Sequence, residues 1–320
     1  MIKWLGALSL AALIAACSPA NKDVPVIGFV DAFQDNTIEQ AKIGFIDALS
    51  KNGFDEKQNT VKIIYRNAQG NIPTLTQIVK YFISQKVSLI ATSPSISTIT
   101  ALQNTNSIPV FMMVSPTPSL MKVAGADGKG PSNLFGIAET LDYIDTSFLL
   151  IPKIVKPKAG SLSVGMIFNQ SEPQSVEAKQ RIEQLAKANG IRLVSLPVNS
   201  SADVKLVTES LLSNNVDAFF ANPDNTVFAS FESIVQSCGK NNIPIFTSEA
   251  GLVARGAVAA FGADIYQWGY QAGEQAAKYL KVKSAQGIEW KMVTIRQRVF
   301  NPEVAKKYNL VIPENFQPVK

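Results

Sequence analysis

Asn106-Ser107-Ile108-Pro109-Val110-Phe111 has a near copy at Asn241-Asn242-Ile243-Pro244-Ile245-Phe246. In both copies a polar turn follows a helical segment and leads through Ile-Pro into an apolar run. Strands that are entered from helices are typical of parallel sheets, which need helical crossover connections. Because the motif occurs once in each half of the 320-residue chain, the sequence predicts two similar α/β lobes.

Short β-rich runs alternate with amphipathic helical segments on either side of this motif. The expected strands are 26–32, 61–68, 88–93 and 108–114 in the first half, and 163–168, 191–198, 217–221, 243–247 and 257–261 in the second. Apolar stripes at helical spacing, such as Ala41, Phe45 and Leu49, predict helices that face a core. The predicted fold class is α/β, with two Rossmann-like lobes that each hold a parallel sheet covered on both faces.

The order of segments predicts that the chain crosses between the lobes more than once. A Gly-rich loop at 125–132 precedes a crossing strand at 133–139. A helix with small residues at Gly269 and Gly273 is expected to return to the first lobe and lie close against its sheet. Strand 289–296 and helix 302–308 would complete a multi-strand hinge. We expect lobe 1 to comprise 26–137 plus about 265–290, and lobe 2 to comprise 138–264 plus about 291–320.

The first residues are typical of an export signal. Residues 1–16 carry one charge at Lys3 and then an apolar run that is too short to span a bilayer comfortably. The following Cys17 completes Ile14-Ala15-Ala16-Cys17, which is similar to the bacterial lipobox. We expect a lipoprotein signal peptide at 1–16, lipidation of Cys17, and a tether at 17–25. The protein would then be extracytoplasmic and anchored to the cell membrane or outer membrane; an ordinary signal peptide with an incidental cysteine is the alternative.

Composition excludes several classes of function. The net charge is +5, but the Lys and Arg residues are scattered singly, so no nucleic-acid partner is expected. The chain has no histidine, which removes the commonest general base and the usual zinc ligand. Neither a GxGxxG turn nor a GxxxxGK[ST] loop is placed to hold a nucleotide. We expect no catalytic residue, no metal and no cofactor, and a buried, inert thiol at Cys238.

The candidate ligand site follows from the predicted sheets, because ligands bind outside the carboxyl ends of parallel strands. Helix N-termini there can hold a carboxylate, and acidic side chains can pair with an ammonium group; among these Asp264 is favoured. Each polar residue could instead be a plain helix cap. Aromatic residues nearby, among them Trp268, would suit a zwitterion with a hydrophobic side chain. The candidates are Phe33, Asp35, Asn36, Ser93, Ser95, Ser115 and Thr117 in lobe 1, and Asn169, Ser171, Glu172, Ser175, Asp224, Asn225, Thr226, Glu249 and Asp264 in lobe 2.

Several of these turns resemble those of one protein family. Residues 169–175 are similar to an N-S-S-E-x-N-S turn, 223–226 to a P-T-D-N turn, and 243–266 to I-P-V-F-x-x-E followed by G-A-x-A-x-x-G-x-D-Y. Over 26–313 the chain resembles solute receptors of ABC importers, bacterial lipoproteins whose characterised members bind aromatic amino acids. The resemblance implies a type 1 periplasmic binding protein fold, with lobes that close on the solute.

The resemblance also implies which residues line the cleft. Ser171, Glu172 and Ser175 would do so from one helix N-terminus, 224–226 from a second, and Asp264 from a third. The first lobe departs from the family at Asp35-Asn36 and at 115–117. The resemblance therefore does not specify which ligand side chain the protein selects. The implied function is capture of a hydrophobic or aromatic amino acid by a non-enzymatic receptor, expected as a monomer, that docks on an ABC permease. A sensory or adhesin receptor with the same clamp is the alternative, and a histidine-free α/β enzyme is less favoured.

Overall fold

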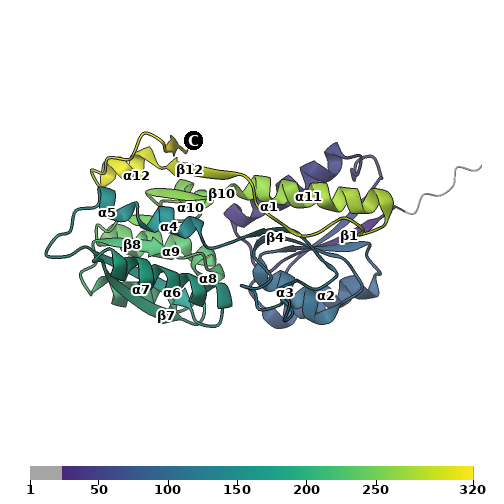
Figure 1. Ribbon diagram of the computed structural model, residues 1–320, viewed down its shortest axis with the longest axis horizontal. Helices are drawn as coiled ribbons and strands as arrows, with labels where there is room; N and C mark the ends of the chain where they lie inside the picture. Colours follow the sequence, from purple (N-terminus) through teal and green to yellow (C-terminus); the bar gives the residue numbers. More distant parts are fainter. Residues whose placement is uncertain (1–23, 320) are drawn as a thin grey trace, which may run out of the picture.

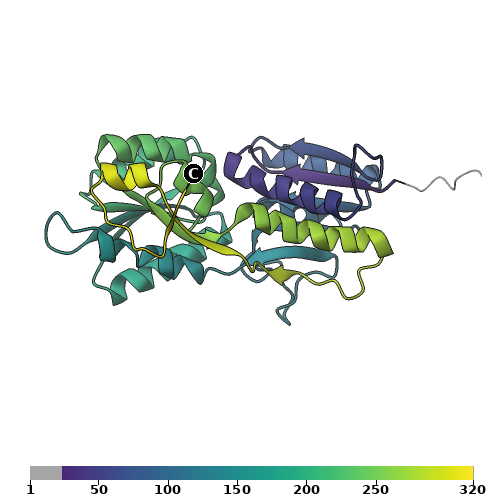
Figure 2. The same cartoon turned by 90° about the horizontal axis from the view of Figure 1, so that it is seen from above.

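The computed structural model describes residues 24–319 and consists of two α/β lobes that lie side by side (Figures 1 and 2). The predicted signal peptide and Cys17 lie outside the described residues. Within 24–319, no helix is both long and apolar enough to cross a membrane. The fold class predicted from the sequence is confirmed.

The first lobe contains a sheet of six parallel strands in the order β11-β5-β4-β3-β1-β2. Helices α1 and α11 cover one face of this sheet, and α2 and α3 cover the other (Figure 1). The strands are β1 (Val26–Asp31), β2 (Lys62–Asn67), β3 (Leu89–Ser93), β4 (Val110–Pro116), β5 (Leu134–Glu139) and β11 (Lys291–Met292), and the helices are α1 (Asn36–Lys51), α2 (Ile72–Ser84), α3 (Ser95–Asn104) and α11 (Ile265–Val282).

The second lobe contains a seven-stranded sheet in the order β13-β12-β10-β9-β8-β6-β7. Its strands are β6 (Ser163–Asn169), β7 (Arg192–Val198), β8 (Ala218–Ala221), β9 (Ile245–Thr247), β10 (Ala259–Ala263), β12 (Arg296–Phe300) and β13 (Gln317–Pro318). Its helices are α4 (Tyr143–Phe148), α5 (Ile151–Ile154), α6 (Pro173–Ala188), α7 (Val204–Leu212), α8 (Asn225–Ala229), α9 (Phe231–Lys240), α10 (Ala250–Ala254) and α12 (Pro302–Lys307).

The repeated Ile-Pro motif occupies the same position in both lobes. In lobe 1 the Pro109 carbonyl accepts from Ile90 N as the chain enters β4, which lies beside β3. In lobe 2 the Pro244 carbonyl accepts from Phe219 N as the chain enters β9, which lies beside β8. Proline has no N–H to donate, so it suits the first residue before a strand.

The expected strand at 289–296 is wrong as a single element. Residues 291–292 form β11 in the first sheet, and 296–300 form β12 in the second, so the chain crosses between the lobes here. β12 pairs antiparallel with β10, with Ala263 opposite Arg296. Since β10 ends at the hinge and β12 begins there, the two strands must run in opposite directions. Two further crossings join β5 to α4 and β10 to α11. The exact division of the chain between the lobes stays a prediction.

The sequence led us to expect that the small residues of α11 pack against the sheet. They pack instead against helix α1. A Cβ added at Gly269 would lie 1.8 Å from the Ala41 carbonyl oxygen of α1, and one added at Gly44 of α1 would lie 2.1 Å from the Tyr266 carbonyl oxygen. Glycine on both helices therefore allows their backbones to touch.

In the second lobe, Cys238 is buried on α9, and burial raises the pKa of its thiol well above the usual range.

Candidate ligand-binding site between the lobes

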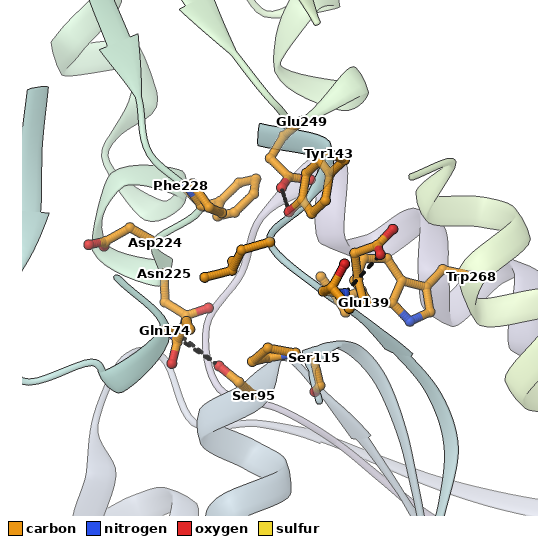
Figure 3. A pocket seen from close by; sticks show the side chains of 15 residues that line it. Ser95, Ser115, Glu139, Tyr143, Gln174, Asp224, Asn225, Phe228, Glu249 and Trp268 are labelled. Atoms are coloured by element: carbon orange, nitrogen blue, oxygen red, sulfur yellow. Dashed lines mark hydrogen bonds between the residues drawn. The ribbon is translucent and has the colours of Figure 1, made fainter. Parts of the chain in front are cut away.

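A cavity of about 50 Å³ lies between the two lobes, and we call it the inner cavity (Figure 3). The end of β4 and the start of α3 line it from the first lobe, and the turns before α8 and α10 line it from the second. The crossing segment after β5 forms a further wall. Its lining residues are Ser95, Val114, Ser115, Pro116, Glu139, Thr140, Leu141, Tyr143, Gln174, Pro223, Asp224, Asn225, Phe228, Glu249 and Trp268.

A larger space of about 550 Å³, which we call the outer groove, adjoins the inner cavity at Asn225. Its lining side chains are mainly amides and hydroxyls from both lobes. They are Ala32, Phe33, Gln34, Gln69, Gly70, Ile72 and Ile96 from lobe 1, and Asn169, Ser171, Glu172, Asn199, Ser200, Ser201, Asn225, Thr226 and Ala229 from lobe 2. The outer groove is therefore a polar surface on which Glu172 is the one acidic residue among the described lining residues.

A polar bridge connects the lobes between these two spaces. Ser95 Oγ, at the start of α3, accepts hydrogen bonds from Gln174 Nε2 at 3.2 Å and from Asn225 Nδ2 at 3.1 Å. Because Ser95 Oγ accepts both bonds, its own hydroxyl proton remains available to a ligand. Gln174 Oε1 is buried and has no partner among residues 24–319. The bridge therefore offers one donor and one acceptor, from opposite lobes.

Glu172 holds the second-lobe side of the bridge in place. Its Oε2 accepts from Gln174 Nε2 at 2.7 Å and from Asn225 Nδ2 at 2.8 Å, and it also accepts from Asn225 N at 3.1 Å. Burial, and then the nearby Asp224 carboxylate, raise the pKa of Glu172 to about 8. Both effects favour the neutral form of the side chain in this conformation.

Asp224 is a helix cap rather than a ligand contact. Its Oδ1 accepts from Thr226 N at 2.8 Å and Val227 N at 3.0 Å at the start of α8. Its Oδ2 accepts from Asn169 N at 2.6 Å and Ser175 Oγ at 2.5 Å. The carboxyl group points away from the inner cavity in Figure 3. Burial raises the pKa of Asp224 as well, whereas its four donors favour the ionised form.

The far end of the inner cavity combines a buried acid with aromatic rings. Glu249 Oε1 accepts from the Tyr143 hydroxyl at 2.8 Å, and burial, followed by the repulsion of Glu139, raises the pKa of Glu249 to about 8. Glu139 is itself held by Arg296 through two bonds of 2.9 and 2.7 Å. The Phe228 and Tyr143 rings flank Glu249 in Figure 3. No Lys or Arg is among the described residues that line the inner cavity, so a phosphorylated ligand does not fit.

The predicted site residues fall into three groups. The inner cavity contains Ser95, Ser115, Asp224, Asn225 and Glu249, whereas the outer groove contains Phe33, Asn169, Ser171, Glu172 and Thr226. The other six lie outside both spaces. Asp35 caps α1, and Asn36 and Asp264 lie in a separate surface pocket beside Arg255. Ser93 is buried at the end of β3, Thr117 lies in the turn after β4, and Ser175 is buried against Asp224.

Asp264, the acid that the sequence favours as an ammonium partner, caps α11. Its Oδ1 accepts from Gln267 N at 3.0 Å, and its Oδ2 accepts from the Gln297 amide. Its carboxyl group therefore has two partners of its own. Of the acidic residues that line the inner cavity, Glu249 is the one that has neither a basic partner nor a helix-cap hydrogen bond among residues 24–319.

Sequence reasoning missed the wall that the hinge provides. Glu139, Leu141 and Tyr143 line the inner cavity from the crossing segment after β5, which the sequence predicted only as a hinge. A ligand held between two lobes also touches the segments that join them, so the predicted crossing strand was the available signal. Gln174 was within a predicted turn, but neighbouring Ser and Glu residues were preferred to it.

The comparisons with known proteins agree with this geometry. The family described as ABC transporter substrate binding protein matches residues 23–318. A "Tyrosine-binding protein" from Clostridioides difficile is 29% identical over 290 residues, which cover 89% of this chain and 81% of the relative.

Two solved structures have the same fold over nearly the whole chain. The ABC domain from Streptococcus pneumonia in complex with L-Trp has a TM-score of 0.82 at 19% identity, and covers 92% of this chain and 99% of its own. The ligand-free, open structure of a Clostridium difficile substrate-binding protein with adhesive properties has a TM-score of 0.67 at 27% identity, and covers 93% and 99%. With the family pattern matched from end to end of the described residues and a cavity enclosed by both lobes, this chain belongs to the ABC transporter substrate-binding protein family.

Proposed function

We propose that this protein is the extracytoplasmic solute receptor of an ABC importer and that it captures an aromatic α-amino acid by closing its lobes. The observation that carries this proposal is the inner cavity, where a donor and an acceptor at one end face aromatic rings at the other. Two relatives, a tyrosine-binding protein and a protein solved in complex with L-Trp, support the same ligand class.

The bridge is suited to the charged end of an amino acid. The Ser95 hydroxyl lies at the positive N-terminal end of the ten-residue helix α3, where a carboxylate is stabilised. Gln174 Oε1 supplies the acceptor that an ammonium group requires. The ligand's side chain then extends toward Phe228, Tyr143 and Trp268, which are the aromatic lining residues.

The size of the inner cavity means that the lobes must separate before a ligand enters. A space of about 50 Å³ has room for one or two water molecules but not for an aromatic ring. Three chain crossings join the lobes, so a hinge motion can open the cleft without unfolding either sheet. Binding energy would be used to draw Ser95 and Gln174 together around the solute.

A binding screen tests this proposal directly. The purified protein, unfolded and refolded to remove any carried-over solute, would be melted with each amino acid and with a panel of sugars and nucleosides. We expect tyrosine, tryptophan or phenylalanine to raise the melting temperature, because a ligand that binds only the folded state stabilises it. A Ser95→Ala variant should bind about tenfold more weakly, whereas Ser107→Ala, on an exposed turn, should not change the affinity. Stabilisation by a sugar alone would overturn the ligand class.

The remaining features of the proposal concern the protein's place in the cell. ABC substrate-binding proteins act outside the cytoplasm and deliver small solutes to a permease. We propose in addition that Cys17 carries a lipid anchor, that the protein is a monomer, and that it has no enzymatic activity. Labelling cells with a fatty-acid analogue should mark the wild-type protein and leave Cys17→Ser unmarked.

An adhesive receptor is the second candidate, because the Clostridium difficile relative is described as having adhesive properties. Uptake of labelled aromatic amino acid by cells that lack this protein separates the two candidates. Uptake should fall sharply if the protein serves an importer, and it should be unchanged if the clamp serves adhesion alone.

A further inference from the structure

We propose that Glu172 is a positioning residue for lobe closure and that the lobes close with uptake of one proton by its carboxyl group. The inference rests on the proposed capture of a solute by lobe closure. It assigns to Glu172 a role different from contact with the ligand. The group acts on the two side chains that reach across the cleft.

The Glu172 carboxyl group orients both amide side chains of the bridge. One carboxyl oxygen, Oε2, accepts from both the Gln174 and the Asn225 side-chain amides, at 2.7 and 2.8 Å. Each amide donates its other hydrogen to Ser95 Oγ in the opposite lobe. Figure 3 shows Gln174, Asn225 and Ser95 converging at one end of the inner cavity. If Glu172 no longer fixed these amides, each would lose the orientation that reaches Ser95.

The surroundings of Glu172 favour its neutral form when the lobes are together. Asp224, in the turn before α8, is the nearest acidic group, and its carboxyl group accepts four hydrogen bonds that favour its ionised form. The first lobe contributes Ser95 and Ile96 of α3, which carry no charge, and Lys122, which is exposed on the opposite edge of the cleft. A second buried negative charge beside Asp224 is costly. Burial and Asp224 accordingly raise the pKa of Glu172 from 4.5 to about 8.

A neutral Glu172 keeps every contact that the bridge needs. Oε2 can still accept from both amides, while a proton on Oε1 can be donated to Thr226 Oγ1, 3.3 Å away. When the lobes separate, lobe 1 no longer covers the half-buried Glu172 side chain, and its pKa moves back toward the ordinary value. The closed form therefore binds one proton more than the open form at pH values between these two pKa values. The proton comes from solvent, and no bond other than the O–H bond is made or broken.

The sign of the pH effect follows from this proton balance. Because the closed form holds more protons, lowering the pH favours closure and tighter binding of the solute. The affinity should rise by up to about tenfold for each pH unit from pH 8 downward and level off near the open-state pKa. The α-amino group of the ligand also begins to titrate at the upper end of this range, and Glu172→Gln, which binds the same ligand, separates that contribution from the one of Glu172.

The test is the affinity for the aromatic amino acid that binds best, measured by calorimetry from pH 5.5 to 8.5 in two buffers of different ionisation enthalpy. We expect the wild type to bind more weakly as pH rises and to take up protons on binding. Glu172→Gln, which mimics the neutral acid, should bind independently of pH and more tightly than the wild type at pH 8.5. Glu177→Gln makes the same change at an exposed position of α6 and should match the wild type. The inference fails if wild-type binding takes up no proton, or if Glu249→Gln instead of Glu172→Gln removes the pH dependence.

A measurement without ligand separates this inference from the proposed function. If no amino acid binds at any pH, the proposed ligand class is wrong, and small-angle X-ray scattering of the free protein still tests Glu172. A smaller radius of gyration at pH 6 than at pH 8 in the wild type, absent in Glu172→Gln, would support proton-linked closure. An equal radius at both pH values in the wild type would overturn it.

Discussion

At the scale of single residues, neighbours decide whether an acidic side chain caps a helix or faces a ligand. Asp224 and Asp264 both precede helices, and the carboxyl group of each accepts at least one hydrogen bond from a backbone N–H group at the helix start. Both residues are therefore helix caps. Glu249 also precedes a helix but makes no cap hydrogen bond. Its only hydrogen-bonded side-chain partner within 24–319 is Tyr143, which leaves it available to the inner cavity.

Replacement of Asp224 by asparagine should destabilise the second lobe. The amide would direct N–H groups at one of the four donors that the carboxylate now satisfies. We expect a loss of about 1 to 3 kcal/mol in the free energy of unfolding, measured by urea denaturation. Asp203→Asn is the matched control, because Asp203 precedes α7 without a side-chain cap bond. Equal losses in the two variants would contradict the role of Asp224.

Glu249 should select for ligands with a hydrogen-bond donor at the far end of the side chain. The phenol of tyrosine and the indole of tryptophan carry such a donor, whereas phenylalanine does not. We expect Glu249→Ala, which removes the acceptor oxygens, to weaken binding of tyrosine or tryptophan by about tenfold more than it weakens binding of phenylalanine. Titration calorimetry of all three ligands measures the difference.

Asp264→Asn provides the contrast with Glu249→Ala. Since Asp264 lies on the α11 cap and outside the inner cavity, its replacement should change the ligand dissociation constant by less than about twofold. Loss of most affinity in Asp264→Asn would instead support the ammonium partner that the sequence alone favours.

At the scale of elements, the contact between α1 and α11 ties a late helix to the first lobe. Gly44, Gly269 and Gly273 let the two backbones approach so closely that no side chain fits between them. The chain leaves the second lobe after β10, forms α11 on the first sheet, and then returns through β11 and β12. The hinge therefore depends on a helix pair that is distant in the sequence.

Gly269→Ala should separate these helices and destabilise the protein. Its Cβ would meet the Ala41 carbonyl, a backbone atom that cannot swing aside, so we expect a loss of at least about 3 kcal/mol. Gly239→Ala on α9 is the control, because its Cβ would meet only the flexible end of Lys307 at 3.6 Å. That variant should gain up to about 1 kcal/mol from helix propensity. Chemical denaturation of both variants distinguishes packing from propensity.

At the scale of the whole molecule, polar contacts and a small apolar contact hold the lobes together, the latter where Ile38 of α1 packs against the apolar cluster of lobe 2. Arg255 of lobe 2 donates to Asp35 Oδ2 at 2.6 Å and to Thr37 Oγ1 at 3.1 Å in lobe 1, while Glu232 binds the same guanidinium group. This ion pair and the Ser95 bridge are small compared with the cores of the two lobes. The closed arrangement can therefore be opened without disrupting either core.

Arg255→Gln should favour the open arrangement. The variant leaves the buried Asp35 carboxylate without its cation, which we expect to weaken ligand binding by about 1 to 2 kcal/mol. Arg181→Gln is the control, because Arg181 pairs with Asp145 inside lobe 2. Scattering should show a larger radius of gyration for Arg255→Gln alone. An unchanged affinity and radius would mean that the ion pair does not hold the lobes.

The fold could be predicted from local signals. The Ile-Pro repeat, the alternation of apolar runs with helical stripes, and the turns after each strand all depend on residues that are close in the sequence. Parallel strands require helices between them, so this pattern leaves few arrangements open. The family also follows from short turns, whose residues cap helices and build the second-lobe side of the cleft.

The composition of the site depended on contacts that no local pattern contains. Ser95 meets Gln174, and Asp35 meets Arg255, only because the two lobes lie against each other. Likewise, the sequence could not decide between cap and ligand contact for Asp224, Glu249 and Asp264, since all three stand before helices. The sequence by itself determined the two sheets and where each one presents its polar turns. Tertiary structure alone decided which of those turns face one another, because burial and hydrogen-bond partners depend on residues up to 220 positions apart.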